Sequence, residues 1–278
     1  MLELHRLLVA LIISLALGVF AFSRQALSAS GTLAAILLGT GVFLLGGADW
    51  FALLAVFFIT SIFLTRFKEG AKSEVVRDFA KGGVRDFWQV LANGGIAGLI
   101  APAFFYYGAP VFFYAFLGVI ATVTADTWAT ELGILSKSRP RLITTGQPVP
   151  VGTSGAISAG GTAIAAVGAL AIGITALAAL QLAGSTLAPQ SLRGAFLLVA
   201  IAVVAGVGGA LLDSLFGATV QSMYYCTHCK KETEKTLHHC GAKTAAIRGF
   251  GWFDNDIVNL ASSMLGAAVA AGLYLLLV

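Results

Sequence analysis

The residues best suited to chemistry lie in the stretch 124–161, where acidic, basic and hydroxyl side chains interrupt two strongly apolar segments. If this part is helical, Asp126 and Glu131 lie within about one and a half turns of each other, with two threonines between them. Hard oxygen ligands of this kind suit Mg²⁺ that is bridged to phosphate. The alternative is that both acids form ion pairs with Lys137 or Arg139 in a solvated loop.

Two further acidic clusters border other apolar segments. Asp213 closes one such segment, and Asp256 opens the last one together with Asn255 and Asn259. Helix capping by Asp254 or Asn255 would explain one residue of the last cluster but not all its polar groups. Acids at membrane helix ends are costly and indicate function. The predicted Mg²⁺ ligands are Asp126, Glu131, Asp213 and Asp256.

A loop rich in Gly, Thr and Ser leads into the apolar segment that begins near residue 157. Glycines and hydroxyls at a helix start present free backbone N–H groups to an anion. Simple N-capping by Thr153 or Ser154 is the alternative. The chain has no Walker A sequence. The phosphate-binding residues predicted in this loop are Thr145, Gly152, Thr153, Ser154 and Gly155.

The basic segment 66–85 and the start of the following helix hold the remaining candidates. Its cations either set the topology or contact anionic groups at the membrane surface. Gln89 and Asn93 are four residues apart on one helix face, where amides either join helices or contact a polar ligand. Further phosphate contacts are predicted for Arg66, Lys72, Arg141, Asn255 and Asn259. The predicted catalytic residues are Asp126, Glu131, Asp213, Arg85 and Asn93.

Three cysteines and two histidines lie close together in the segment 222–253. Three thiolates and one imidazole complete a tetrahedral Zn²⁺ shell. Cytosolic thiols stay reduced, so a metal site is favoured over a disulfide, and unliganded cysteines are the alternative. Four ligands leave no open position, which predicts a structural zinc site. Its predicted ligands are Cys226, Cys229, His238 and Cys240.

These residues must be positioned by membrane helices. Hydrophobic residues make up 58% of the 278 residues and charged residues only 11%, whereas a soluble domain has about a quarter charged residues. We therefore predict an all-α polytopic membrane protein, one domain over residues 1–278 with a possible zinc-binding appendage at 222–253. About eight spans are expected, at 7–22, 31–47, 49–65, 87–105, 110–125, 157–182, 194–212 and 256–277.

The distribution of charge sets the expected topology. Fourteen of the seventeen Lys and Arg residues lie in the segments 66–85, 126–156 and 213–253. By the positive-inside rule these segments share the cytoplasmic face, and with eight spans both termini lie on the other side. Because the basic segments are also acidic and are separated by spans, we do not expect nucleic-acid binding. All the polar clusters fall at the same predicted face.

Taken together, the motifs resemble those of a family of polytopic membrane proteins, long catalogued as a domain of unknown function, that includes the plant phytyl-phosphate kinases. The matching pieces run in one order from 65 to 259, and residues 1–64 match only as apolar spans. The pieces are Thr65-Arg66 to Gly70, Gly83 to Gly94, Ala125 to Gly133, Thr144 to Gly155, Leu212 to Thr219 and Asp254 to Asn259.

The resemblance implies phosphoryl transfer from a nucleoside triphosphate, CTP above all, to a prenyl monophosphate such as phytyl or geranylgeranyl phosphate. We therefore predict a membrane-embedded, Mg²⁺-dependent prenyl-phosphate kinase whose active face is cytoplasmic. The alternatives are a nucleotidyltransferase that acts on a lipid phosphate and a non-enzymatic transporter of anionic lipids. A transporter would more naturally bind its ions near the bilayer midplane, on broken helices.

Overall fold

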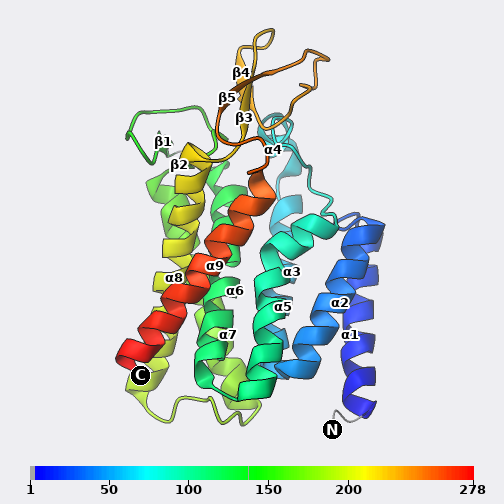
Figure 1. Cartoon of the computed structure of the whole chain (residues 1–278), viewed down its shortest axis with the longest axis vertical. Coiled ribbons are helices and arrows are strands. Elements are labelled where there is room, and N and C mark those ends of the chain that lie inside the picture. The colour runs from blue at the N-terminus through cyan, green and yellow to red at the C-terminus, as the bar shows by residue number, and fades with distance from the viewer. Residues whose placement is uncertain (1–3, 137) are drawn as a thin grey trace.

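Long apolar helices run side by side in alternating directions and form the body of the molecule in the computed structural model (Figure 1). The structure describes residues 4–136 and 138–278. Within them, seven helices are long and apolar enough to cross a membrane, and α2, with 17 residues, is shorter. These eight helices are α1 Leu4–Ser23, α2 Ala29–Leu45, α3 Ala48–Arg66, α5 Phe87–Tyr107, α6 Pro110–Gly133, α7 Ala159–Leu182, α8 Leu192–Thr219 and α9 Asn255–Leu277.

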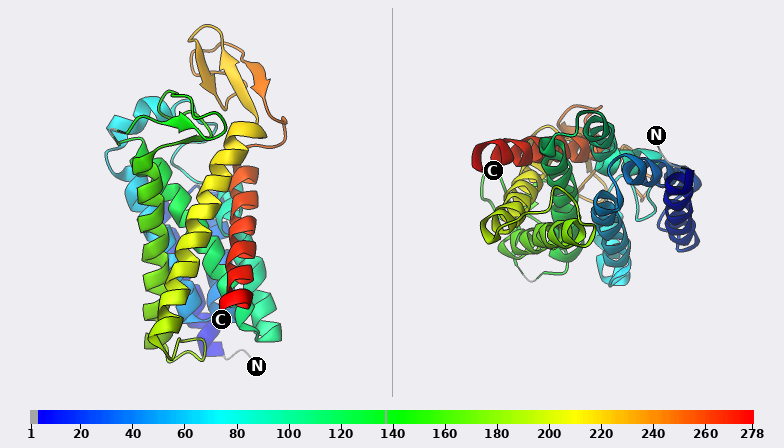
Figure 2. Two further views of the ribbon diagram at one scale, coloured as in Figure 1. Left: turned by 90° about the vertical axis from the view of Figure 1, so that its left-hand side faces the viewer. Right: turned by 90° about the horizontal axis from the view of Figure 1, so that it is seen from below.

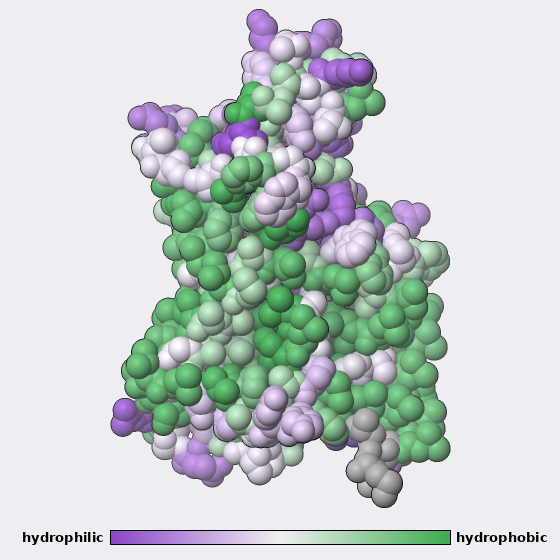
Figure 3. All heavy atoms as spheres, viewed as in Figure 1, coloured by the Kyte–Doolittle hydropathy of each residue, from purple (hydrophilic) through white to green (hydrophobic). Residues whose placement is uncertain are grey.

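Each predicted span corresponds to one of these helices, which confirms the polytopic α-helical fold. The chain termini lie at one end of the bundle and the three basic segments at the other (Figure 1). On the face shown in Figure 3, a broad hydrophobic surface covers the body between these two ends. The main difference in length is that α6 and α8 continue to Gly133 and Thr219, beyond the predicted ends at 125 and 212. Asp126 and Asp213 therefore lie within helices, not after them.

Small elements cover the basic end. Helix α4, Glu69–Val76, follows α3, and a two-stranded ribbon, β1 Arg141–Leu142 with β2 Ala156–Ile157, lies between α6 and α7. Residues 222–253 form what we call the appendage. It carries an antiparallel sheet of order β4-β3-β5, with β3 Met223–Cys226, β4 Lys231–Thr233 and β5 Ala245–Arg248 (Figure 2). The hydrophobic pattern had indicated none of these short strands.

Helix α6 is the centre of the bundle. Its residues from Phe116 to Ala125 are all buried, and it contacts α3, α5, α7, α8 and α9. Helix α1, in contrast, packs mainly on α2 and lies at the rim of the molecule (Figure 2). A helix that is buried all round must offer its neighbours a close fit.

That close fit comes from glycines that face Thr122. Gly209 of α8 and Gly266 of α9 both adjoin this side chain, and a Cβ added at either position would overlap with it. The Thr122 hydroxyl also donates a 3.2 Å hydrogen bond to the Ala205 carbonyl of α8. Small residues let membrane helices approach closely. We call Thr122, Gly209 and Gly266 the glycine layer.

Because this layer leaves no room for a methyl group, Gly209→Ala is expected to destabilise the protein by about 1–3 kcal/mol through overpacking. Gly208→Ala is the matched control, since a Cβ at Gly208 meets no atom within 4 Å. Thermal unfolding of the purified protein in one detergent measures both variants. Equal stability of the two variants would contradict the close contact between α6 and α8.

Candidate functional site

Two predicted acids, Asp126 and Asp213, meet one helical turn above the glycine layer. Asp126 follows Thr122 by four residues and Asp213 follows Gly209 by four, so each lies on the same helix face as its layer residue. On the antiparallel helix α9, Ser262 precedes Gly266 by four residues and donates a 3.0 Å hydrogen bond to Asp213 Oδ2. The two carboxylates are close enough to repel each other. Among the described residues, neither forms an ion pair.

Glu131 has a different environment, on the side of α6 that faces α3 and α4. Thr65 Oγ1 donates a 2.6 Å hydrogen bond to one carboxylate oxygen, and the Lys72 ammonium pairs with the other. Lys72 is only 2% exposed and also donates to the carbonyls of Leu64 and Thr65, at 2.8 and 3.0 Å.

All three N–H donors of Lys72 are therefore used. The Lys72 ammonium is buried and fully bonded, and its contact with phosphate stays a prediction. Glu131 does form an ion pair, as the alternative in the sequence analysis stated, but its partner is Lys72. Of the two partners considered earlier, Lys137 lies outside the described residues, and Arg139 lies beside the loop that precedes α7.

Arg85 extends the same hydrogen-bond network. Its guanidinium donates to Ser61 Oγ and Thr65 Oγ1, both at the long distance of 3.3 Å. Burial lowers the pKa of Arg85, and the negative charge of Glu131 opposes this effect. Arg85 is thus a half-buried cation whose guanidinium, among the described residues, donates only long hydrogen bonds to neutral hydroxyls.

A second lysine, Lys81, forms ion pairs with two further acids, Asp86 and Asp256. Its ammonium lies 2.9 Å from Asp86 Oδ2 and 2.5 Å from Asp256 Oδ2. Burial alone would lower the pKa of Lys81, but the hydrogen bonds with Asp256 and Asp86 outweigh burial and raise it. Asp86 also caps α5 in a capping box with Gln89. The sequence prediction included neither Lys81 nor Asp86, although this capping pattern is visible in the sequence.

Glu234 of the appendage was also missed. Its carboxylate accepts hydrogen bonds from the Ala80 backbone N–H at 2.8 Å and from Gln221 Nε2 at 3.0 Å. Burial raises the pKa of Glu234 despite these hydrogen bonds, and the charges of Asp254 and Asp256 add to the increase. Glu234 also interacts electrostatically with Asp213.

Acids from five parts of the chain thus form a continuous series of interacting charges at the basic end of the bundle. In Figure 3 hydrophilic surface gathers below the appendage, between the upper ends of α9 and α5. We call this set the polar centre. Its members are Asp126, Asp213, Glu234, Asp256, Asp86 and Lys81.

The loop before α7 does not form the helix start that we predicted. The cap of α7 is Ser158, which accepts from Gly161 N at 3.0 Å, so Thr153 and Ser154 precede the strand β2 instead. Thr153 donates to the Pro150 carbonyl and Ser154 to Gln221 Oε1, at 2.9 and 2.6 Å. The prediction of helix N-terminal amides at 152–155 was wrong, because these residues form the turn that leads into β2 and α7 begins only at Ala159. Gly155, with φ of 81°, packs against the α8 backbone instead.

Several predicted phosphate ligands lie outside the polar centre. Arg66 is exposed and donates to the carbonyls of Arg24 and Gln25 at 2.6 and 2.8 Å. Arg141 is exposed and donates to the Gly146 carbonyl at 2.8 Å, and Thr145 is exposed in the same loop. The structure does not bring these three side chains to the acids.

The predicted amides lie nearer to the acids. Asn93 donates to the Gln89 carbonyl at 2.8 Å, one turn further along α5. Asn255 is exposed at the start of α9, where Asp254 provides the cap by accepting from Ile257 N at 3.1 Å. Asn259 lies one turn into α9, and its carbonyl accepts from Ser262. These amide roles stay predictions.

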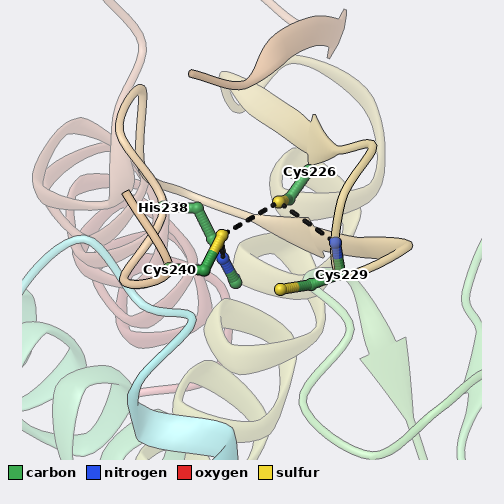
Figure 4. Close-up of side chains that lie close together, drawn as sticks. All are labelled: Cys226, Cys229, His238 and Cys240. Atoms are coloured by element: carbon green, nitrogen blue, oxygen red, sulfur yellow. Dashed lines mark hydrogen bonds between the residues drawn. The ribbon is translucent and has the colours of Figure 1, made fainter. Parts of the chain in front are cut away.

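The Cys/His residues of the appendage converge as the spacing predicted (Figure 4). Cys226, Cys229, His238 and Cys240 form a group whose ligand atoms lie within 4.8 Å of one another, so it could bind a metal ion. The Cys226 and Cys240 sulfur atoms are 3.7 Å apart, close to the edge of about 3.8 Å of a tetrahedral zinc–thiolate site. A hydrogen bond from His238 lowers the pKa of the Cys240 thiol to about 6, which favours the thiolate form that binds metals.

The His238 ring is oriented by Asp78, which the sequence analysis did not identify. Nδ1 lies 3.2 Å from the Cys240 sulfur, and Nε2 lies 3.1 Å from Asp78 Oδ1. A carboxylate on the second ring nitrogen is a common outer partner of a metal-bound histidine. His239, in contrast, is more exposed and lies 3.8 Å from Asp78.

The predicted set of four Mg²⁺ ligands does not form one compact group. Among the described residues, the groups of three or more ligand side chains within 4.8 Å are the Cys/His group and Asp78 with the two histidines. Glu131 and Asp256 are each paired with a lysine. This leaves Asp126 and Asp213 as the carboxylates suited to share a cation, and Mg²⁺ commonly uses one or two carboxylates together with phosphate oxygens.

Fold and site together define a polytopic helical membrane protein that carries a polar centre at one face. The chain belongs to the family described as integral membrane protein DUF92, whose model matches residues 12–267. This membership confirms the family resemblance that the motifs indicated. A comparison with solved structures found no match.

Three curated relatives show the extent of the similarity. Protein PGR of Arabidopsis thaliana is 34% identical over 274 residues, which cover 94% of this chain and 93% of that protein. An uncharacterized membrane protein of Methanocaldococcus jannaschii is 31% identical over 215 residues, with 77% and 83% covered. The chloroplastic protein VTE6 of Arabidopsis thaliana is 30% identical over 259 residues, with 88% and 64% covered.

The buried pair of Lys72 and Glu131 leads to a stability test. Lys72→Met leaves the Glu131 carboxylate without its cation, and we expect a loss of about 3–5 kcal/mol. Adding Glu131→Gln to Lys72→Met is expected to restore part of that loss, because the uncompensated charge is then removed. Lys68→Met, at an exposed lysine in the same segment, is the control. Thermal unfolding that is equal for Lys72→Met and Lys68→Met would exclude a buried ion pair.

Proposed function

We propose that this protein is a magnesium-dependent membrane kinase that transfers a phosphoryl group from a nucleoside triphosphate to an isoprenoid monophosphate. Membership of the family supports this reaction class, and the resemblance implies CTP as the donor and phytyl or geranylgeranyl phosphate as the acceptor. The observation that carries the proposal is the meeting of Asp126 and Asp213, neither of which forms an ion pair among the described residues. Glu131 and Asp256, by contrast, are each paired with a lysine.

In this proposal Asp126 and Asp213 hold the metal, and Lys81 and Arg85 lie where they attract phosphate groups. When bound, Mg²⁺ supplies positive charge to the triphosphate oxygens. An oxygen of the prenyl phosphate attacks the γ-phosphorus, and the bond from that phosphorus to the β–γ bridging oxygen breaks. The products are the prenyl diphosphate and a nucleoside diphosphate. A phosphate monoester is largely ionised near neutral pH, so positioning and electrostatic stabilisation suffice without a general base.

We place the site at the cytoplasmic face, because fourteen of the seventeen Lys and Arg residues lie in the segments at that end of the bundle. The acceptor phosphate then enters at the level of the lipid headgroups, and the nucleotide comes from the aqueous side. We also propose that residues 1–278 act as one domain, with the appendage as a part of its site.

The reaction is tested through the two central carboxylates. Asp126→Asn and Asp213→Asn are each expected to lower the rate at least about a hundredfold, since each removes a charged metal ligand. Glu74→Gln, at an exposed acid of α4, is the control and should leave the rate unchanged. Lipid mass spectrometry follows detergent-purified protein with Mg²⁺, each nucleoside triphosphate and a panel of prenyl phosphates.

The reaction products also distinguish the kinase from the nucleotidyltransferase and the lipid carrier. Formation of a nucleoside diphosphate fits the kinase, whereas release of pyrophosphate with a nucleotidyl-lipid would identify a nucleotidyltransferase. If no substrate-dependent nucleotide consumption occurs under any of these conditions, the kinase proposal fails and a lipid carrier is favoured. Near-normal turnover by Asp126→Asn would rule out its role as a metal ligand.

We further propose that the Cys/His group binds a structural zinc ion that keeps the appendage docked on the segment 77–81. Three contacts support this role: the Asp78 carbonyl accepts from Glu234 N at 3.0 Å and from Thr233 Oγ1 at 2.7 Å, and Lys235 donates to the Arg77 carbonyl at 2.8 Å. Together with the contact from His238 to Asp78, they hold the backbone just before Lys81.

Zinc removal should therefore increase the mobility of the segment 77–81, although this segment contains no zinc ligand. Cys226→Ser is expected to abolish stoichiometric zinc and to increase amide hydrogen exchange at 77–81. His228→Ala is the control, because this exposed histidine lies within the knuckle but outside the ligand group. Metal analysis and hydrogen exchange measure the two effects separately. Unchanged zinc content in Cys226→Ser would exclude the site, and unchanged exchange after zinc loss would exclude its effect on the segment.

A further inference from the structure

An apolar crevice lies beside the polar centre, between the α1–α2 pair and helices α3 and α5. Its walls are formed by side chains such as Leu17 of α1, Leu38 of α2 and Leu54 of α3. No residue of α6, α7, α8 or α9 lines it. The crevice therefore lies outside the central core, in the part of the bundle where α1 packs mainly on α2.

One end of the crevice is polar. Ser61, Arg85, Gln89 and Asn93 line it together with the apolar side chains. Ser61 and Arg85 lie at the basic end of α3 and at the start of α5, and Arg85 also donates to Thr65, the hydroxyl partner of Glu131. The polar end therefore adjoins the network that leads to the catalytic residues, whereas the rest of the crevice runs into the membrane.

We infer that this crevice holds the isoprenoid chain of the substrate, with the substrate phosphate at Arg85. The inference rests on the proposed function for the identity of the headgroup. A single hydrocarbon chain with one anionic end matches a narrow apolar crevice that has one cation at its mouth. A guanidinium suits phosphate oxygens through parallel N–H donors, and the 3.3 Å hydrogen bonds of Arg85 to hydroxyls are long enough for phosphate to replace them.

The crevice is long enough for part of such a chain. On α3 it extends from Ser61 to Phe51, ten residues or about 15 Å along a helix axis. That length accommodates several isoprene units. The crevice lies next to α1, which packs mainly on α2 at the rim of the molecule, so a chain can enter sideways from the bilayer. This assigns the first three helices, which carry none of the acids of the polar centre, a role in binding the lipid chain.

The position of the chain is measured by photo-crosslinking the full-length protein with a geranylgeranyl phosphate that carries a diazirine at its far end. Crosslinks are expected on α1, α2, α3 and α5, and unlabelled geranylgeranyl phosphate should compete with them. Crosslinks that fall on α7 or α8, or evenly on all lipid-facing helices, would overturn the assignment. Competition by phospholipid alone would also overturn it, because the occupant would then be an acyl chain of the bilayer.

A variant that fills the crevice gives a second readout. Ala55→Leu adds bulk to the crevice wall and is expected to raise KM for geranylgeranyl phosphate about tenfold, but not KM for a five-carbon prenyl phosphate. Gly41→Leu is the control, since Gly41 lies outside the crevice and a Cβ there meets no atom within 4 Å. Equal effects on both chain lengths would contradict the inference, and thermal unfolding checks that both variants fold.

The two proposals can fail independently. Crosslinking does not need turnover, so crosslinks in the crevice without any kinase activity would support lipid binding and contradict the proposed reaction. Kinase activity with crosslinks on other helices would support the proposed reaction and contradict the position assigned to the lipid chain.

Discussion

The close approach of α6, α8 and α9 around Thr122 determines the geometry of the whole site. Gly209 and Gly266 leave no space beside this threonine, so the three helices keep a fixed spacing and rotation. One turn further along each helix, this spacing places Asp126, Asp213 and Ser262 together. A packing constraint inside the membrane thus produces a polar arrangement at its surface. The strongly buried part of α6 is rigid for the same reason, and the acids are not carried on mobile loops.

The ion pairs around this arrangement determine which acids are available to bind a metal ion. Lys72 pairs with Glu131 on the α3 side, and Lys81 pairs with both Asp86 and Asp256 on the α5 and α9 side. Leaving a buried acid without a partner is costly. Asp126 and Asp213 nevertheless repel each other with no cation among the described residues to offset this. An arrangement of this kind favours the binding of an external cation. The lysines on either side reduce the competition from Glu131, Asp86 and Asp256 for it.

Local sequence patterns were sufficient for the helices and for the Cys/His group, because apolar run length and ligand spacing are local properties. They were insufficient where a contact joins distant segments. Asp78 meets His238 across 160 residues, and Glu234 meets Ala80 across 154. The burial of Lys72 depends on the turn between α3 and α4, where Lys68 has a φ of 50°. Residues 152–155 were placed at a helix start because two-residue strands leave no periodic signal.

The long-range contacts that sequence patterns could not predict also explain why the appendage lies between α8 and α9. From that position it reaches across the bundle to the segment 77–81, which precedes α5. Its Glu234 bridges the Ala80 backbone and the Gln221 side chain at the end of α8, and it interacts with the acids of α8 and α9. The appendage therefore fixes the ends of α5 and α8 at the basic side of the bundle relative to each other, where packing within the membrane can no longer do so. Since α5 also lines the lipid crevice, the same contacts set the position of Arg85 at the mouth of the crevice relative to Asp126 and Asp213.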